Sequence, residues 1–266
     1  MEIAVGSRPG APQRGDGEAY VAEIVAPGIV LLAVAHGFGR IRERPAPAVA
    51  AQAVRDNLKR RVRCERRDPR LALSAAFSAA NARIYAHSGS TDDFVASGTS
   101  LTAALIVGDH AFVGHVGATR AYLSRDGTLS TLTTDDALGE GSLRLLTRTL
   151  GTQPTLEPAL AHLRLMHGDA LLLSSGALHE LLADDEIADA LRLAASSEDV
   201  TARLLAIAGI RGEGAGTVIV GRAFHELSYE ADGRRRPVRE TLFALAVMFA
   251  ATIIAIYLLH AFLTPG

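Results

Sequence analysis

The sequence predicts an α+β domain followed by a helix that spans a membrane. Strand-like and helix-like patterns alternate in blocks over residues 1–228, which is typical of layered α+β domains. The 266 residues carry a formal net charge of −2 and one cysteine, so neither a basic field for nucleic acid nor a disulfide framework is expected. Every Asp, Glu, Lys and Arg lies at or before Glu240, and the last 26 residues carry none.

The first expected elements are a β-hairpin and two helices. Pro27-Gly28 separates two apolar runs, which is the pattern of a hairpin turn. Two Ala-rich segments follow with apolar residues at helical spacing, and Asp68-Pro69 separates them. The expected ranges are Tyr20–Val25 and Ile29–Ala35 for the strands, and Ala46–Arg63 and Leu71–His87 for the helices.

An antiparallel meander is expected next, because tight turns at Gly108-Asp109 and Asp126-Gly127 join short apolar runs. One buried strand, three helices and two closing strands complete the domain, with Asp184 as the N-cap of the second helix. The expected strands are Ser100–Val107, Ala111–Val116, Arg120–Ser124, Thr128–Leu132, Leu171–Ser174, Thr217–Val220 and Phe224–Leu227, and the expected helices are Leu178–Leu182, Asp184–Ala194 and Ser197–Ile207.

The C-terminal segment predicts a membrane anchor. Thr241–Leu263 has 23 residues without a formal charge and, as a helix, spans roughly 34 Å, enough to cross a bilayer core. A buried terminal helix is the alternative, but such helices rarely run this long without a polar face. Arg234–Arg236 and Arg239 precede the run, which predicts a cytoplasmic location for the preceding domain. The expected organisation is therefore a domain at 1–228, a basic linker at 229–240 and a single transmembrane helix at 241–263.

Several segments, taken in order, resemble the bacterial PPM-type (protein phosphatase 2C-like) Ser/Thr phosphatases. The resemblance covers nearly all of the first 228 residues and implies a four-layer α/β/β/α sandwich with two antiparallel sheets. It also implies a reaction in which two or more Mg²⁺ or Mn²⁺ ions activate water to cleave phosphoserine and phosphothreonine esters. The segments are AVAHGFGR (33–40), SGTSLTAALIVGDHAFVGHVGATRAYLSRDGTLSTLTTD (97–135), TRTLGT (147–152), GDALLLSSGALHELLADDEIADAL (168–191) and GTVIVG (216–221).

The same resemblance identifies where this chain departs from the family. Family members provide a metal-binding Asp in each of four motifs, namely DG-x-G, GDSR, SDGL and a late DN. The matching positions here are His36, Ala118, Gly176 and Gly214. Gly37 keeps the backbone oxygen of the first motif, and Glu18 best matches the Asp of the N-terminal NED motif. Because a pair of divalent ions needs several nearby anions, we expect no metal to bind.

Other candidate residues have weaker support. Arg14 is the nearest match to the phosphate-binding Arg of the family, Arg8 is the alternative, and an ordinary surface Arg is the plain interpretation. Arg120 is expected to support its loop, although it is a second candidate for a phosphate contact. Glu213 replaces the carboxylate missing at the neighbouring position only if its loop shifts. His115 lies inside an expected strand and is interpreted as a packed histidine.

The sequence favours a membrane-anchored pseudophosphatase that acts by binding, without a metal cofactor. The expected partners are the cell membrane, through the C-terminal helix, and a cytoplasmic Ser/Thr kinase or a phosphoprotein, but no nucleic acid. One alternative is a weakly active phosphatase with an atypical site of His36, Glu18 and Glu213 around one Mn²⁺, or with Mg²⁺. Another alternative is a structural subunit of a membrane complex, with the C-terminal helix packed against its partners.

Overall fold

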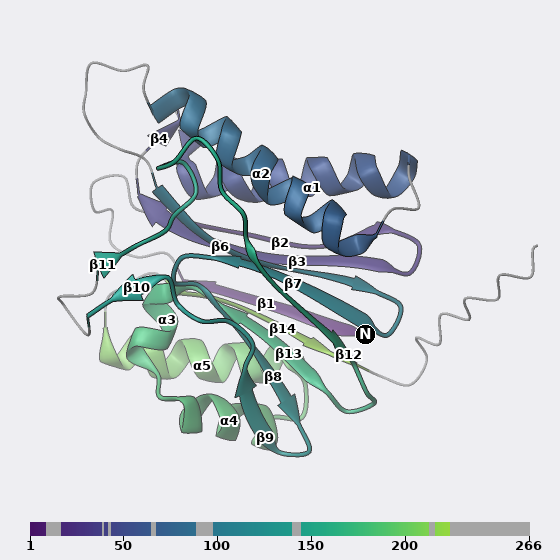
Figure 1. The fold of residues 1–266 in the computed structure, drawn as a ribbon. Helices are drawn as coiled ribbons and strands as arrows, with labels where there is room; N and C mark the ends of the chain where they lie inside the picture. The colour runs from purple at the N-terminus through teal and green to yellow at the C-terminus, as the bar shows by residue number, and fades with distance from the viewer. Residues whose placement is uncertain are drawn as a thin grey trace, which may run out of the picture. The chain divides into compact units, whose positions relative to one another are not determined.

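Two five-stranded antiparallel sheets lie face to face, with two helices outside one sheet and three outside the other (Figure 1). The structure is a computed structural model that describes residues 1–8, 17–38, 40–41, 44–64, 68–88, 98–139, 145–212 and 216–223. The chain divides into two units, Met1–Ser228 and Tyr229–Gly266. All described residues belong to the first unit.

The first sheet has the strand order β12-β7-β6-β3-β2. Its central strands are long and apolar because both of their faces are covered, and β6 is buried along almost its whole length. The β2–β3 hairpin turns at Pro27-Gly28, where Gly28 adopts a φ of 71°. The strands are β2 (Gly17–Ala26), β3 (Ile29–Phe38), β6 (Gly98–Val107), β7 (His110–Val116) and β12 (Ala159–Arg164).

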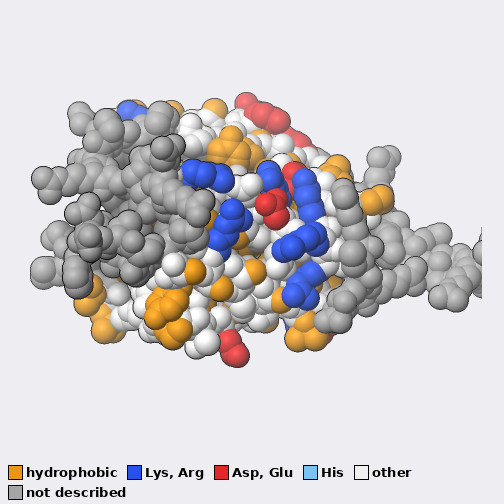
Figure 2. Space-filling view, turned by 90° about the horizontal axis from the view of Figure 1, so that it is seen from above, with side chains coloured by type: hydrophobic (Ala, Val, Ile, Leu, Met, Phe, Trp, Pro, Cys, Tyr) orange, Lys and Arg blue, Asp and Glu red, His pale blue; other side chains and the backbone are white. Residues whose placement is uncertain are grey.

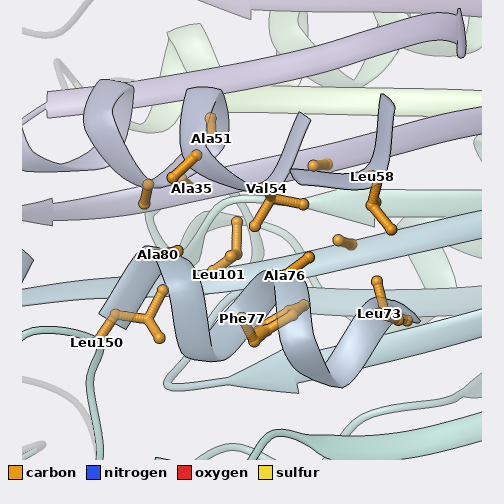
Figure 3. Close-up of a cluster of buried hydrophobic side chains, with 14 of the residues drawn as sticks. Ala35, Ala51, Val54, Leu58, Leu73, Ala76, Phe77, Ala80, Leu101 and Leu150 are labelled. Carbon is orange, nitrogen blue, oxygen red and sulfur yellow. The ribbon is translucent and has the colours of Figure 1, made fainter. Parts of the chain in front are cut away.

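Two long helices, α1 (Ala46–Cys64) and α2 (Pro69–Ser88), cover the outer face of this sheet (Figure 1). Figure 3 shows small residues of both helices, such as Ala51, Ala76 and Ala80, among the buried side chains, together with Phe77 of α2. Phe77 is fully buried, as is Leu101 on β6. The Ala-rich composition of both helices therefore serves close helix-to-sheet packing. Two strands of two residues each, β4 (Arg40–Ile41) and β5 (Arg44–Pro45), pair just before α1.

The second sheet has the order β1-β14-β13-β8-β9. Three helices cover its outer face and form a second apolar cluster with it. The strands are β1 (Glu2–Arg8), β8 (Arg120–Arg125), β9 (Thr128–Thr131), β13 (Ala170–Ser174) and β14 (Gly216–Arg222), and the helices are α3 (Gly176–Leu181), α4 (Asp184–Leu193) and α5 (Ser197–Arg211). A separate pair of short strands, β10 (Ala137–Leu138) and β11 (Leu145–Leu146), forms a small hairpin.

A third apolar cluster fills the space between the two sheets. Leu32 and Val34 of β3 meet Leu171 and Leu173 of β13 there, while Leu31 and Ala33 face the helices instead. This alternation follows from the two-residue period of a strand. It assigns the even-numbered residues of β3, including His36, to the inter-sheet side.

The predicted α+β layering is confirmed, and most expected elements are present with boundaries that differ by a few residues. The structure corrects two points of detail. Asp184 is the first residue of α4, and the N-cap is Ala183, whose amide donates to the Glu186 carboxylate over 3.1 Å. The sequence patterns also missed β1 and β12, which form one edge of each five-stranded sheet, and the two-residue strands β4, β5, β10 and β11. Most residues of β1 and β12 are partly or fully exposed, so these strands lack the apolar run that marks a buried strand.

Two predictions lie outside the described residues. They are the closing strand Phe224–Leu227 and the transmembrane helix Thr241–Leu263. Within the described ranges, no helix is both long and apolar enough to cross a bilayer.

Candidate functional site

The candidate site lies at one end of the layer between the two sheets. His36 stands near the end of β3, directly opposite Glu18 on β2 and Ser100 on β6 in the strand register. Because paired residues in an antiparallel ladder project to the same face, all three occupy the inter-sheet side. The loops that follow β7 and β13 reach this end from the other direction. The strand register thus places a carboxylate, an imidazole and a hydroxyl in a row.

Three of the four positions matched to family Asp residues meet at this end. A Cβ atom built on Gly176 would lie 3.3 Å from His36 Nδ1 and 3.4 Å from the carbonyl oxygen of Ala118. Ala118 is only 7% exposed and its amide donates to Ser100 Oγ over 3.0 Å. These residues come from three separate parts of the chain, so their proximity is a property of the fold.

Two glycines let the backbones approach closely at this site. A Cβ on Gly37 would lie 2.1 Å from the carbonyl oxygen of Gly98, so β3 and β6 would have to separate to admit any side chain. Gly117 has a φ of 95°, and a Cβ there would lie 2.2 Å from Ser100 Oγ. The Gly117 amide donates to Asp136 Oδ2 over 2.9 Å, which holds the loop after β7 in place.

The Glu18 carboxylate is held by hydroxyl groups from the opposite sheet. Thr217 Oγ1 donates to Glu18 Oε2 over 2.5 Å. Ser7 Oγ lies 3.1 Å from the same Thr217 oxygen and donates to it, because the Thr217 hydrogen is already used. Among the described residues, Glu18 Oε1 is buried without a hydrogen-bond partner. Within the described ranges, one carboxylate oxygen is therefore satisfied and the other is not.

Arg120 supports its loop, as the sequence predicts. Its Nε and Nη2 atoms donate to the Asp135 carboxylate, with Nη2 to Oδ2 at 2.7 Å. This ion pair raises the pKa of the Arg120 guanidinium above its ordinary value, since losing the proton would break the pair. His179 and Tyr122 also contact the pair. The Arg120 guanidinium therefore holds its loop through these hydrogen bonds to Asp135.

His115 is a packed histidine, as the sequence predicts. It is 2% exposed, and its Nε2 lies 3.1 Å from the Thr134 carbonyl oxygen, which can only accept a hydrogen bond. The neutral ring therefore carries its hydrogen on Nε2 and presents Nδ1 to Thr102 Oγ1 at 2.9 Å. Burial lowers the pKa of His115, although the carboxylates of Asp136 and Asp135 oppose the effect.

We expect this buried ring to weaken the domain in mild acid. Because the pKa of His115 is lower in the folded state than in the unfolded state, the unfolded chain binds the proton first as pH falls below about 6.5. The free energy of unfolding should then fall more between about pH 7.5 and about pH 5.5 in the natural chain than in His115→Gln. Urea titrations of both full chains at each pH measure this difference. Equal losses in the two chains would contradict it.

The remaining sequence candidates are not at the inter-sheet site or are outside the described residues. Gly214, Glu213 and Arg14 belong to the second group. Arg8 is described, and its guanidinium lies against Gly209 of α5, because a Cβ at that glycine would overlap Arg8 Nη1. The structure therefore places Arg8 on the outer face of its sheet, away from His36.

The described donor atoms do not fit the two-metal centre that the resemblance implies. Across the described ranges, no group of three or more His, Cys, Asp or Glu side chains is placed to hold a metal ion. Glu18 is one carboxylate, and one of its oxygens already accepts from Thr217. His36 offers one free nitrogen at a position where a bridging ligand needs two oxygens. Mg²⁺ and Mn²⁺ prefer several oxygen ligands, so this set is too small and too weakly anionic.

Sequence reasoning missed the hydroxyl residues of the site. Ser100, Ser175 and Thr217 are buried there, and Ser175 Oγ accepts from the Thr217 amide over 3.1 Å. All three belong to segments that carry the resemblance, but an isolated Ser or Thr gives no chemical signal. Only the pairing of the strands shows that these three side chains lie together on the inter-sheet side.

Comparisons with known proteins identify the class of protein to which this chain belongs. The protein phosphatase 2C family model matches residues 30–138. The serine/threonine protein phosphatase PstP of Mycobacterium tuberculosis is 34% identical over 164 residues, which cover 56% of this chain but 31% of that protein. The chain thus spans about a third of the length of this curated relative.

Solved structures extend the match over the whole described domain. The M. tuberculosis phosphatase PstP/Ppp superposes with a TM-score of 0.69 at 27% identity, covering 84% of this chain and 99% of that one. A PstP catalytic domain in complex with two manganese ions gives a TM-score of 0.68 at 30% identity, covering 82% and 96%. The fold is therefore that of PPM-type Ser/Thr phosphatases. This chain belongs to the protein phosphatase 2C family.

Proposed function

We propose that this protein is a catalytically inactive member of its family that acts by binding in Ser/Thr phospho-signalling. The observation that carries the proposal is the composition of the site. His36, Ala118 and Gly176 come together where the family resemblance implies three aspartates. The described residues of the site include a single carboxylate, which provides too little negative charge to hold two divalent cations close together. Without them, no water is activated at neutral pH.

The proposal includes anchoring to the cell membrane. Residues 241–263 form the transmembrane helix, and 229–240 form a basic linker that keeps domain 1–228 in the cytoplasm. The support comes from the sequence, since these 23 residues carry no Asp, Glu, Lys or Arg. A cytoplasmic Ser/Thr kinase or its phosphorylated substrate is the partner that this arrangement favours. The relative PstP is named a serine/threonine protein phosphatase, which supports a place for this chain in Ser/Thr phospho-signalling.

One observation favours a second candidate function, a weakly active phosphatase with one Mn²⁺ or Mg²⁺. Glu18 Oε1 is buried without a partner among the described residues, and a buried oxygen of this kind is costly unless something binds it. His36 and Glu213 would complete the ligand set in this alternative. It requires the loop around Glu213 to bring a second carboxylate to the site.

A metal titration separates the two functions. The full chain in detergent is titrated with Mn²⁺ by calorimetry, and hydrolysis of p-nitrophenyl phosphate is assayed across the same concentrations. For the inactive protein we expect no saturable binding up to millimolar Mn²⁺ and no Mn²⁺-dependent hydrolysis. Saturable binding with turnover that His36→Ala abolishes would establish the second function instead. His167→Ala removes an imidazole elsewhere on the surface and serves as the matched control.

A further inference from the structure

The C-terminal half of α1 and the start of α2, at the end of the helical layer opposite the candidate site, are rich in Lys and Arg. Between Arg55 and Arg70 the sequence has eight Lys or Arg residues and three Asp or Glu residues, in a chain whose net charge is −2. This stretch contains the C-terminal half of α1 and the start of α2. Figure 2 views the molecule from the side of these helices and shows Lys and Arg side chains gathered on this face around a few acidic ones.

Only part of this positive charge is neutralised within the described residues. Lys59 Nζ lies 3.0 Å from Glu23 Oε2, and Arg55 Nη2 lies 3.0 Å from Asp56 Oδ1. Arg60 and Arg61 follow on the same helix, and their hydrogen-bond partners are neutral. Arg60 Nε donates to the Asp56 carbonyl oxygen over 3.3 Å, and Arg61 Nε donates to Asn57 Oδ1 over 2.8 Å.

Arg70, at the start of α2, adds a third cation with a neutral partner. Its Nη2 lies 3.1 Å from His162 Nδ1 on β12. A guanidinium nitrogen can only donate, so His162 Nδ1 accepts this hydrogen bond and carries no hydrogen. Burial and the nearby Arg70 charge also lower the pKa of His162, which favours the neutral ring. We call Arg60, Arg61 and Arg70 the basic end of the domain.

The described chain ends on the same side as the basic end. His162 lies on β12, and just after that strand the Leu165 amide donates to the Asp109 carbonyl oxygen over 2.7 Å. The Gly168 amide then donates to the carbonyl oxygen of Ala223 over 3.0 Å, and Ala223 is the last described residue. The last described residue of the domain therefore lies at the same end of the strands as the basic end, while His36 lies at the far end of β3. Figure 1 shows this arrangement, with α2 starting near the end of β12 and with β10 and β11 at the opposite side.

We propose that the basic end binds the anionic surface of the bilayer in which the chain is anchored. The inference rests on the anchoring in the proposed function. A tether at this end favours encounters between the basic end and the lipid headgroups, and charges attract one another over about 8–10 Å at physiological salt. Cations with neutral partners give up no ion pair on meeting anionic lipid. The contact turns the candidate site away from the membrane, toward partners in solution.

Site-specific labels on the full chain in nanodiscs test this orientation. Cys64→Ser removes the only cysteine, and a single fluorophore is attached through Leu71→Cys near the basic end or Leu145→Cys near the site. Leu71 is 65% exposed and Leu145 is 68% exposed, so neither change disturbs the core. The nanodiscs carry a quencher on their headgroups and contain phosphatidylcholine with or without phosphatidylserine.

We expect phosphatidylserine to increase quenching at Leu71→Cys but not at Leu145→Cys. High salt and the double variant Arg60→Gln/Arg61→Gln should both abolish the increase, because the attraction is electrostatic. The matched control Arg192→Gln/Arg203→Gln removes two exposed charges from α4 and α5 and should leave the increase intact.

Three outcomes would overturn the proposal. A chain that does not insert into nanodiscs contradicts the anchor and, with it, this orientation. A chain that inserts but shows equal quenching at Leu71→Cys in the two lipids overturns the orientation alone. Loss of binding to a phosphorylated peptide in Arg60→Gln/Arg61→Gln, with quenching unchanged, would assign the basic end to a protein partner instead.

Discussion

Replacing His36, Ala118, Gly176 and Gly214 together with aspartate is expected to create Mn²⁺ binding and Mn²⁺-dependent phosphatase activity. The structure brings three of these positions together, so new carboxylates there would converge at one point. At about 100 times its Kd, Mn²⁺ should raise the free energy of unfolding by about 2.7 kcal/mol. Thermal unfolding of the full chain with and without Mn²⁺ measures this gain, alongside hydrolysis of a phosphate ester.

The four changes must be made as a set. A side chain at residue 176 meets the His36 ring at 3.3 Å, and His36→Asp removes that ring and its steric conflict. Ala118 is buried, so Ala118→Asp adds a carboxylate that only a nearby cation compensates. In the absence of metal we therefore expect the quadruple variant to be less stable than the natural chain, because its carboxylates repel one another.

The corresponding quadruple asparagine variant is the control. Asparagine has nearly the same shape as aspartate but lacks its negative charge, so it should leave the chain without Mn²⁺-dependent stabilisation. Equal responses of the aspartate and asparagine variants to Mn²⁺ would contradict both the family match at these positions and their convergence.

The change Gly37→Ala is expected to destabilise the domain by about 3 kcal/mol or more. The added Cβ would lie 2.1 Å from the Gly98 carbonyl oxygen and 2.7 Å from Thr99 Cα, which are both backbone atoms. No side-chain rotation relieves such a contact, so β3 and β6, two inner strands of their sheet, must separate where β3 ends and β6 begins. Urea unfolding of the full chain, with its midpoint and slope, measures the loss.

Gly127→Ala provides the matched control for this prediction. Gly127 has a φ of 77°, and nothing lies within 4 Å of an added Cβ. The change should therefore destabilise the domain only by the cost of placing alanine in the left-handed region, roughly 1–2 kcal/mol. A loss for Gly37→Ala no larger than that for Gly127→Ala would mean that the two strands do not approach as closely as the structure has them.

Local chemistry explains which elements the sequence predicts well. The Pro27-Gly28 and Asp126-Gly127 turns are correctly placed, because the positive φ values at Gly28, Asp126 and Gly127 suit these residue types whatever surrounds them. The buried strands have strong apolar patterns for the same local reason. The edge strand β1 has no such signal, and its seven residues become a strand by pairing with β14 more than 200 positions away.

The candidate site likewise has features that the sequence predicts and features that only the fold decides. The loss of carboxylates at His36, Ala118, Gly176 and Gly214 is a property of the sequence, because charge is fixed by residue type. Family resemblance indicates where those positions belong. The resemblance does not say what holds Glu18 or which groups of the site are satisfied, since these depend on hydroxyls that carry no pattern of their own.

The sequence by itself therefore determined the layered fold, and it predicts the positions of the site and the shortage of negative charge there. Only the tertiary structure decided which groups meet. Thr217 donates to Glu18 across 199 positions of the chain, and the basic end (Arg60, Arg61 and Arg70) lies at the same end of the strands as the last described residue. The physical reason is that hydrogen bonds and surface fields depend on distance in space, which sheet pairing sets, whereas turn propensity and residue charge are local.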